Sequence, residues 1–248
     1  DVTENTEVDM SQAGAAALFS MDDNNTIYAK NIYEQMAPAS LTKVMTALVA
    51  LKHSSPDDML TASANVKITE SGATKCGLKE GDQMTMNQAL HALLIHSAND
   101  AAILIAEGVA GSVEAFCEMM NEEAKALGAT NCHFVNPHGL TAEDHYVTAY
   151  DMYLIFNEAL NYQLIGEIIS QPSYTTVYKD KDGSISSSNL YLRGEKDMPG
   201  SITVIGGKTG TTNAAKNCLI LLSRSSSGKS YISVILRSES RETLYDEM

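Results

Sequence analysis

The spacing of apolar residues changes twice along the chain, and this change limits the folds that it can adopt. Strand-like runs lie near both ends, at 13–20, 26–33, 174–178, 185–192, 202–205, 218–222 and 231–236. The middle carries apolar residues at a helical spacing, at 40–53, 87–97, 100–110, 113–127 and 148–160. We therefore predict one α/β (α+β) domain over 1–248, with a sheet assembled from both termini and a helical lobe at about 55–165 inserted between them.

The charge balance excludes two classes of partner. The 248-residue chain carries 17 Lys and Arg against 31 Asp and Glu, which gives a formal charge of −14. Such a surface repels phosphate backbones and anionic lipids, so we expect no nucleic acid and no anionic membrane surface as a partner. No apolar run approaches the roughly 20 residues that a spanning helix needs, and we expect a soluble domain.

The four cysteines stand singly, at 76, 117, 132 and 218. They form no Cys-x-x-Cys pair, so their spacing indicates neither a zinc site nor a redox motif. Their neighbours favour buried free thiols, and a Cys117–Cys132 disulfide stays open. The acidic start, Asp1–Asp9, has no initiator Met and no signal sequence, which is typical of a mature secreted protein or a trimmed chain.

A serine and a lysine one helical turn apart form the first candidate site. Ser40 begins the predicted 40–53 helix, and Lys43 follows on the same face. Apolar residues cover most of this helix, which predicts that it is buried. Burial lowers the pKa of a lysine until its neutral amine can take a proton, and a hydroxyl beside such an amine is an activated nucleophile. Ser226 and Lys229 repeat the spacing, but they lie in a polar turn.

The second candidate is a serine and an asparagine two residues apart. Ser97 and Asn99 lie in a turn between two apolar helices, where both side chains can point into one cleft. There they would serve proton transfer and the binding of a substrate amide. The motif is weak on its own, because Ser63-Ala-Asn65 and Ser187-Ser-Asn189 match it too.

The third candidate, Gly206-Gly-Lys-Thr-Gly-Thr-Thr212, follows the predicted 202–205 strand. Lys208 and two hydroxyls along a strand edge suit a bound peptide that carries a carboxylate. We expect the flanking glycines to let a substrate backbone approach closely.

Together the motifs follow the order Ser-x-x-Lys, Ser-x-Asn, Lys-Thr-Gly, which is typical of penicillin-binding proteins and class A β-lactamases. The wider sequence, from about Ala13 to Arg237, resembles the low-molecular-mass D-alanyl-D-alanine carboxypeptidases, which are penicillin-binding serine peptidases of the penicilloyl-serine-transferase superfamily. The segments that carry the resemblance are Pro38-Ala-Ser-Leu-Thr-Lys43, Leu94-Ile-His-Ser-Ala-Asn-Asp-Ala-Ala102, Asn136-Pro-His-Gly-Leu140 with His145-Tyr146, and Gly207-Lys-Thr-Gly-Thr-Thr212.

The resemblance implies a β-lactamase/DD-peptidase-like fold, with an antiparallel sheet flanked by helices and the site between them. It implies that Ser40 attacks the carbonyl of the penultimate D-alanine while Lys43 accepts the proton. Ser97 would relay a proton toward the departing D-alanine with help from Lys208, and Asn99 would hold the substrate's amide. Water would then hydrolyse the acyl-enzyme.

The resemblance also implies an oxyanion hole made by the backbone N–H groups of Ser40 and Thr211. The substrate-binding residues it implies are Lys208, Thr209, Gly210, Thr211 and Arg237. The arginine would assist in binding the terminal carboxylate, and Arg241 is the alternative for this role.

The implied partners are a peptidoglycan stem peptide ending in D-Ala-D-Ala and, as inhibitors, β-lactam antibiotics. No metal or cofactor enters this scheme, and the expected location is extracytoplasmic, in the cell envelope. The resemblance implies a C-terminal β-rich domain and an amphipathic membrane anchor in the full protein, and we expect neither within 1–248. Because 241–248 reads as a helix that stops early, we expect the native chain to continue and to reach the membrane through that missing part.

Three other functions are weighed against this one. A metallo-peptidase would use His138 and His145, but no His-Glu-x-x-His occurs. A serine β-lactamase would need a carboxylate for the deacylating water, for which 70–82 is the candidate segment, and an Asp where Ala98 stands. A penicillin-binding-like sensor with slow turnover would commonly have lost one of the three groups that this chain keeps: Ser40, Lys43 and Lys208.

Overall fold

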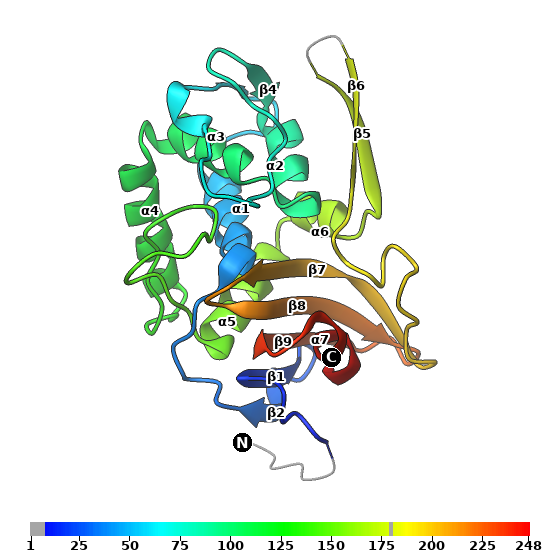
Figure 1. The fold of residues 1–248 in the computed structure, drawn as a ribbon. Helices are drawn as coiled ribbons and strands as arrows, with labels where there is room; N and C mark the ends of the chain where they lie inside the picture. The colour runs from blue at the N-terminus through cyan, green and yellow to red at the C-terminus, as the bar shows by residue number, and fades with distance from the viewer. Residues whose placement is uncertain (1–7, 179–180) are drawn as a thin grey trace.

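The central sheet contains strands from both ends of the chain (Figure 1). The computed structural model describes residues 8–178 and 181–248. All neighbouring strands are antiparallel, in the order β2-β1-β9-β8-β7. They are β1 (Ala15–Ser20), β2 (Asn25–Lys30), β7 (Ile202–Thr212), β8 (Lys216–Ser225) and β9 (Ser230–Ser238). This arrangement confirms the predicted fold class.

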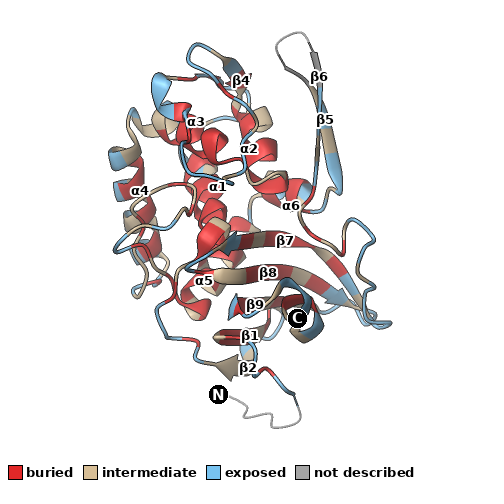
Figure 2. Cartoon of the chain, viewed as in Figure 1, coloured by how far each residue is buried: buried red, intermediate tan, exposed pale blue. Residues whose placement is uncertain are grey.

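Six helices from the middle of the sequence form a lobe beside the sheet (Figure 1). They are α1 (Thr42–His53), α2 (Met86–Ile95), α3 (Asn99–Ala110), α4 (Val113–Ala126), α5 (Ala149–Ala159) and α6 (Gln163–Ile169). A 3₁₀ turn, η1 (Ala39–Leu41), leads into α1. Helix α1 contacts α2, α3, α4 and α5, and its residues 42–50 are all buried (Figure 2). Its apolar residues on all sides explain this central position.

The opposite face of the sheet is covered by α7 (Arg241–Glu247), which packs on β8 and β9. Successive residues of a strand point to opposite faces. Thus Cys218 and Ile220 join the core beneath the helices, whereas Leu219 and Leu221 join a second cluster with Leu244 of α7.

Short elements complete the fold. The strands β3 (Met59–Thr61) and β4 (Gln83–Thr85) pair with each other, as do β5 (Ser173–Tyr178) and β6 (Lys181–Ser186), and a second 3₁₀ turn is η2 (Ala64–Val66). A capping box between Thr85 and Gln88 starts α2.

Three details differ from the sequence-based prediction. Helix α6 was not predicted, because it is short, contains Gly166 and has no side-chain cap at Tyr162. The strand predicted over 185–192 ends at Ser186, and part of the turn predicted at 179–183 lies outside the described residues. The Lys-Thr-Gly motif does not follow a strand but lies inside β7, which continues to Thr212.

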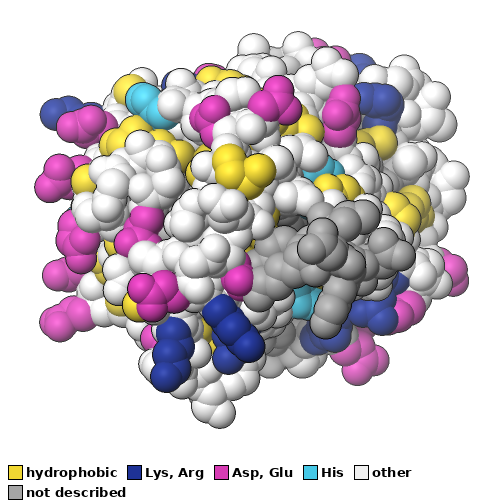
Figure 3. Space-filling model, turned by 90° about the horizontal axis from the view of Figure 1, so that it is seen from above, with side chains coloured by type: hydrophobic (Ala, Val, Ile, Leu, Met, Phe, Trp, Pro, Cys, Tyr) yellow, Lys and Arg dark blue, Asp and Glu magenta, His cyan; other side chains and the backbone are white. Residues whose placement is uncertain are grey.

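Acidic side chains are scattered over the face in Figure 3 with basic ones between them. Within the described ranges, no helix has the length and the apolar content to cross a membrane. All four cysteines are free thiols.

A turn at 136–140 packs directly beneath η1 and depends on a glycine. The Asn136 Oδ1 atom accepts hydrogen bonds from the backbone N–H groups of His138 and Gly139, at 3.3 and 2.7 Å. Gly139 has a φ of +90°, and a Cβ atom there would lie 1.8 Å from the carbonyl oxygen of Ala39. This close approach fixes the backbone beside Ser40.

We predict that Gly139→Ala destabilises the protein by more than about 3 kcal/mol, because a positive φ and a backbone clash combine. Gly128→Ala is the matched control: its φ is +80°, but a Cβ there would meet nothing within 4 Å. Its expected cost is about 1–2 kcal/mol. Urea unfolding measures the free energy of unfolding of both variants. Equal losses would show that the contact with Ala39 does not contribute to stability.

Candidate active site

Ser40 and Lys43 meet at the start of the central helix. Ser40 lies in η1 rather than in α1 itself, and its side chain lines a pocket. The Lys43 Nζ atom lies 2.7 Å from Ser40 Oγ. Because the first turns of this helix are enclosed by the rest of the lobe, Lys43 is completely buried. The sequence-predicted nucleophile and amine are therefore in hydrogen-bond contact.

The surroundings of Lys43 favour its neutral form. Burial first, and the charge of Lys208 second, hold the pKa of Lys43 well below its usual value of 10.5. Its other two partners are Asn99 Oδ1 at 2.9 Å and the His138 carbonyl oxygen at 2.7 Å. These oxygens only accept hydrogen bonds. A neutral amine therefore donates its two N–H groups to them and directs its lone pair at the Ser40 hydroxyl.

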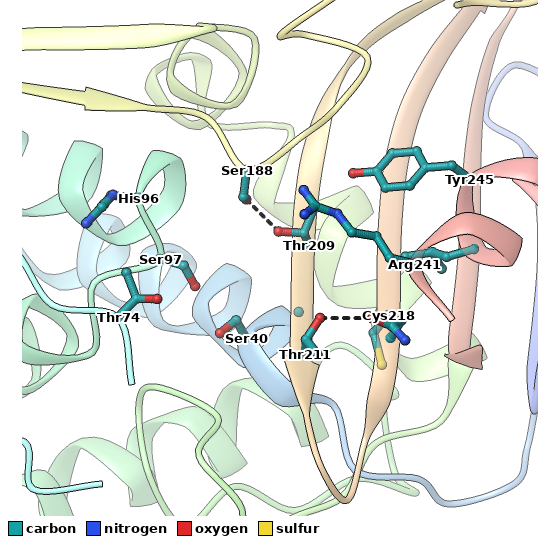
Figure 4. Close-up of a pocket in the computed structure, with 13 residues that line it drawn as sticks. Ser40, Thr74, His96, Ser97, Ser188, Thr209, Thr211, Cys218, Arg241 and Tyr245 are labelled. Atoms are coloured by element: carbon teal, nitrogen blue, oxygen red, sulfur yellow. Dashed lines mark hydrogen bonds between the residues drawn. The ribbon is translucent and has the colours of Figure 1, made fainter. Parts of the chain in front are cut away.

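The turn between α2 and α3 brings Ser97 to the same place. Its φ is +61°, a conformation that is uncommon for a residue other than glycine and that is found at functional sites. The Ser97 Oγ atom accepts a hydrogen bond from Lys208 Nζ at 3.1 Å. Ser97 lines the pocket together with Ser40, as Figure 4 shows.

Asn99 is turned away from the pocket and toward Lys43. Its Nδ2 donates to the Thr74 carbonyl oxygen at 3.1 Å, and its Oδ1 accepts from Lys43. The side chain is buried and does not line the pocket. In this structure the Asn99 amide is bonded to Lys43, and the role that the resemblance implies for it, holding the substrate's amide, stays a prediction.

Lys208 is the second buried lysine of the site. It lies inside β7, and its Nζ donates to Ser97 Oγ and, at 2.8 Å, to the Thr209 carbonyl oxygen. Burial lowers its pKa from 10.5 to about 7. Lys43 thus contacts Ser40, and Lys208 contacts Ser97.

The glycines of β7 serve a purpose other than the expected one. A Cβ atom at Gly210 would lie 2.8 Å from the Ser40 backbone nitrogen, and one at Gly206 would lie 2.1 Å from the Ile169 carbonyl oxygen. They therefore let β7 approach the protein's own backbone at η1 and α6, and the expectation that they also let a substrate backbone approach stays a prediction.

The pocket contains residues that sequence reasoning did not find (Figure 4). Ser188 Oγ lies 2.5 Å from Thr209 Oγ1, and Thr211 Oγ1 donates to Asn217 Oδ1 at 3.3 Å. The only sequence signal was the Ser187-Ser-Asn189 match, which was discounted. The residues that line the pocket are Ser40, Thr74, His96, Ser97, Ser188, Thr209, Gly210, Thr211, Asn217, Cys218, Arg241, Leu244 and Tyr245.

Arg241, the alternative to Arg237, lines the pocket, and which arginine binds a carboxylate stays a prediction. The ladder between β8 and β9 is irregular near Asn217, and Arg237 has a φ of +57°. Its Cβ atom faces Gly14 in a separate hollow beside β1. Arg241, the first residue of α7, extends its side chain along the pocket on the side of Thr209 (Figure 4).

The histidines weighed as metal ligands have structural partners. His145 Nδ1 accepts from the Val135 N–H at 3.0 Å, and His145 Nε2 lies 2.9 Å from Thr42 Oγ1. His138 Nδ1 accepts from the Leu140 N–H at 3.1 Å. Burial lowers the pKa of His138 to about 3 and that of His145 to about 4, so both rings are neutral at pH 7. Over 8–178 and 181–248, no group of three His, Cys, Asp or Glu side chains is placed to hold a metal.

Solved structures with this fold include penicillin-binding enzymes. A D-alanyl-D-alanine carboxypeptidase from Mycobacterium tuberculosis matches with a TM-score of 0.87 and 25% identity, over 100% of this chain and 94% of the other. A penicillin-binding protein from Listeria monocytogenes in its cefotaxime-bound form matches with a TM-score of 0.83 and 27% identity, over 99% of this chain and 96% of the other.

Sequence relatives carry the same name. D-alanyl-D-alanine carboxypeptidase DacF of Bacillus subtilis is 37% identical over 84% of this chain, and DacC of Escherichia coli is 33% identical over 88%. The matches span only 53% and 54% of those two proteins. A family model described as D-alanyl-D-alanine carboxypeptidase matches residues 2–240. The chain, with its paired Ser40 and Lys43, therefore belongs to the D-alanyl-D-alanine carboxypeptidase family of serine peptidases.

Proposed function

We propose that this chain removes the terminal D-alanine from peptidoglycan stem peptides through an acyl-enzyme on Ser40. The observation that carries the proposal is the buried amine of Lys43, whose Nζ lies 2.7 Å from Ser40 Oγ and within hydrogen-bond distance of two carbonyl oxygens. Family membership supplies the substrate class, because the relatives are named for D-alanyl-D-alanine.

In the proposed acylation step, Ser40 Oγ attacks the carbonyl carbon of the penultimate D-alanine and its proton passes to Lys43 Nζ. The N–H groups of Ser40 and Thr211 hold the developing oxyanion, and each such donor is worth about 3 kcal/mol in a transition state. The close approach of Gly210 to the Ser40 backbone nitrogen supports this assignment, because it brings the backbone of β7 next to that of η1.

In the proposed release step, the C–N bond breaks and the departing amine takes a proton from Ser97. Lys208, 3.1 Å from Ser97 Oγ, returns a proton to that hydroxyl. The proton that Lys43 took from Ser40 then restores Lys208, so that Lys43 is neutral again when water attacks the acyl-enzyme. Lys43 takes one proton of that water and passes it to Ser40 Oγ as the acyl C–O bond breaks. Asn99 acts here by orienting Lys43.

The terminal carboxylate of the peptide is assigned to the wall made by Thr209, Thr211 and Arg241. Two hydroxyls donate hydrogen bonds, and the guanidinium adds a positive charge. Lys208 lies behind this wall and strengthens the positive potential when protonated.

Two alternatives use the same nucleophile. A serine β-lactamase needs a carboxylate at the deacylating water, and among the described residues that line the pocket there is no Asp or Glu. A sensor with slow turnover would bind a β-lactam but would not release D-alanine. Assays of D-alanine release and of acylation by a β-lactam distinguish these functions.

The location follows from the substrate. Peptidoglycan lies outside the membrane, so we place the enzyme in the cell envelope, with β-lactams as inhibitors.

The single-domain boundaries and attachment to the membrane through a further C-terminal segment stay predictions. The catalytic unit we propose needs both halves of the chain, because Ser40 and Lys208 come from different halves.

We predict that the protein releases D-alanine from a peptide ending in D-Ala-D-Ala and that Ser40→Ala abolishes the release. Mass spectrometry after exposure to a β-lactam is expected to show a persistent acyl group on the peptide that contains Ser40. An adduct without D-alanine release would indicate a sensor. A transient adduct with rapid drug hydrolysis would indicate a β-lactamase.

The pH dependence of kcat/KM reports the free enzyme. We expect an acid limb from Lys43, because the protonated amine cannot accept the Ser40 proton. We expect kcat/KM to fall as the pH rises through about 7, because Lys208 then loses its charge. In Lys208→Arg the guanidinium stays charged but cannot return a proton to Ser97, so we expect a lower kcat/KM that no longer falls near pH 7. An alkaline limb that persists near pH 7 in Lys208→Arg would show that another group causes it.

We predict that Arg241→Ala lowers kcat/KM about tenfold for a peptide with a free carboxylate, mainly through KM, because a charge-assisted contact is lost. Arg237→Ala is the matched control, with an expected change below about twofold. A larger loss of kcat/KM in Arg237→Ala than in Arg241→Ala would indicate that Arg237 binds the carboxylate.

A further inference from the structure

A buried carboxylate outside the pocket holds the loop that carries Thr74. Asp100, in the first turn of α3, is 1% exposed. Its Oδ1 accepts the backbone N–H groups of Cys76 and Ala101, each at 3.0 Å, and the Cys76 thiol at 3.4 Å. Its Oδ2 accepts the N–H groups of Gly77 and Leu78, each at 2.9 Å. Three consecutive N–H groups of one loop therefore point at one carboxylate.

The loop conformation required for this contact is unusual. Residues 73–79 have no regular secondary structure, and Gly77 has a φ of +86°. A residue in the left-handed region turns successive N–H groups toward one point, which makes a concave anion site. Here the protein's own carboxylate fills that site.

The same loop is connected to the reactive amine through one carbonyl group. The Thr74 carbonyl oxygen accepts both the backbone N–H of Asn99, at 2.9 Å, and its side-chain Nδ2, at 3.1 Å. This fixes the orientation of the Asn99 amide, so that Oδ1 faces Lys43 Nζ. Thr74 itself also lines the pocket, beside Ser97 (Figure 4).

We propose that Asp100 is a positioning residue for the reaction: its carboxylate fixes the 74–78 loop so that the Thr74 carbonyl orients the Asn99 amide, and Asn99 in turn directs the lone pair of Lys43 at Ser40. The inference rests on the proposed function, because it assigns Asp100 a place in the activation of the same nucleophile. Asp100 touches neither the pocket nor the reacting atoms.

The first test variant is Asp100→Asn, which keeps the shape of the side chain. Its amide nitrogen would face N–H donors that need an acceptor, so the loop is released. We expect kcat for D-alanine release, and the rate of acylation by a β-lactam, to fall about 10- to 100-fold, because small displacements of catalytic groups have such effects. KM is expected to stay within about threefold, since the carboxylate wall is untouched.

The second variant approaches the same contact from the loop. Gly77→Ala opposes the positive φ, while a Cβ atom there would meet nothing within 4 Å, so the fold is kept. It is expected to reproduce the kcat effect in the same direction.

A matched control is Asp151→Asn, another buried carboxylate in the first turn of a helix, whose Oδ2 accepts the Asn131 N–H at 2.8 Å. It is expected to lower the melting temperature but to keep kcat within about threefold.

A spectroscopic readout separates positioning from a general loss of stability. The side-chain amide protons of Asn99, assigned by their absence from Asn99→Asp, are expected to exchange slowly with water in the wild type and Asp151→Asn. They are expected to exchange faster in Asp100→Asn and Gly77→Ala. Unchanged kcat in both test variants would overturn the inference, as would lost kcat with unchanged Asn99 exchange, or an equal loss in Asp151→Asn. A wild type that neither releases D-alanine nor is acylated would overturn the proposed function, and the inference with it.

Discussion

Two lysine side chains are buried where the helical lobe meets the sheet, and the chemistry of the site depends on that burial. A buried ammonium group is costly because it loses its hydration, so the pKa values of Lys43 and Lys208 are both lowered. The two also repel each other when charged. The lowered pKa makes the neutral amine of Lys43 more available as a base than the amine of an exposed lysine.

The rest of the structure keeps these amines dry and in place. Gly139 lets the 136–140 turn pack beneath η1, so that the His138 carbonyl oxygen reaches Lys43. Gly210 lets β7 touch the backbone of Ser40. Helices α2 and α3 present Ser97 and Asn99 from a third direction. The site is therefore a junction of four segments that are distant in sequence: η1 with α1, the turn between α2 and α3, the 136–140 turn, and β7.

Much of this could be predicted from the sequence, because the signals were local. The all-round apolar pattern of α1 predicted a buried Lys43, and the alternating runs near both termini predicted the sheet. Thr74 and Asn217 had no such signal, because one lies in an irregular loop and the other reaches the pocket through the pairing of β7 with β8. The choice between Arg237 and Arg241 depended on a local irregularity in β9, which periodicity does not reveal.

The central claim is that burial and the charge of Lys208 lower the pKa of Lys43, so that its neutral amine is available to take the Ser40 proton. A titration followed by NMR of the Lys43 Cε and Nζ signals, assigned by their absence from Lys43→Met, tests it directly. The account predicts a pKa well below 10.5, rising in Lys208→Met, because the neighbouring charge that lowers it is removed. A Lys43 that titrates at or above 10.5 would contradict the account, since Ser40 would then have no base within hydrogen-bond reach.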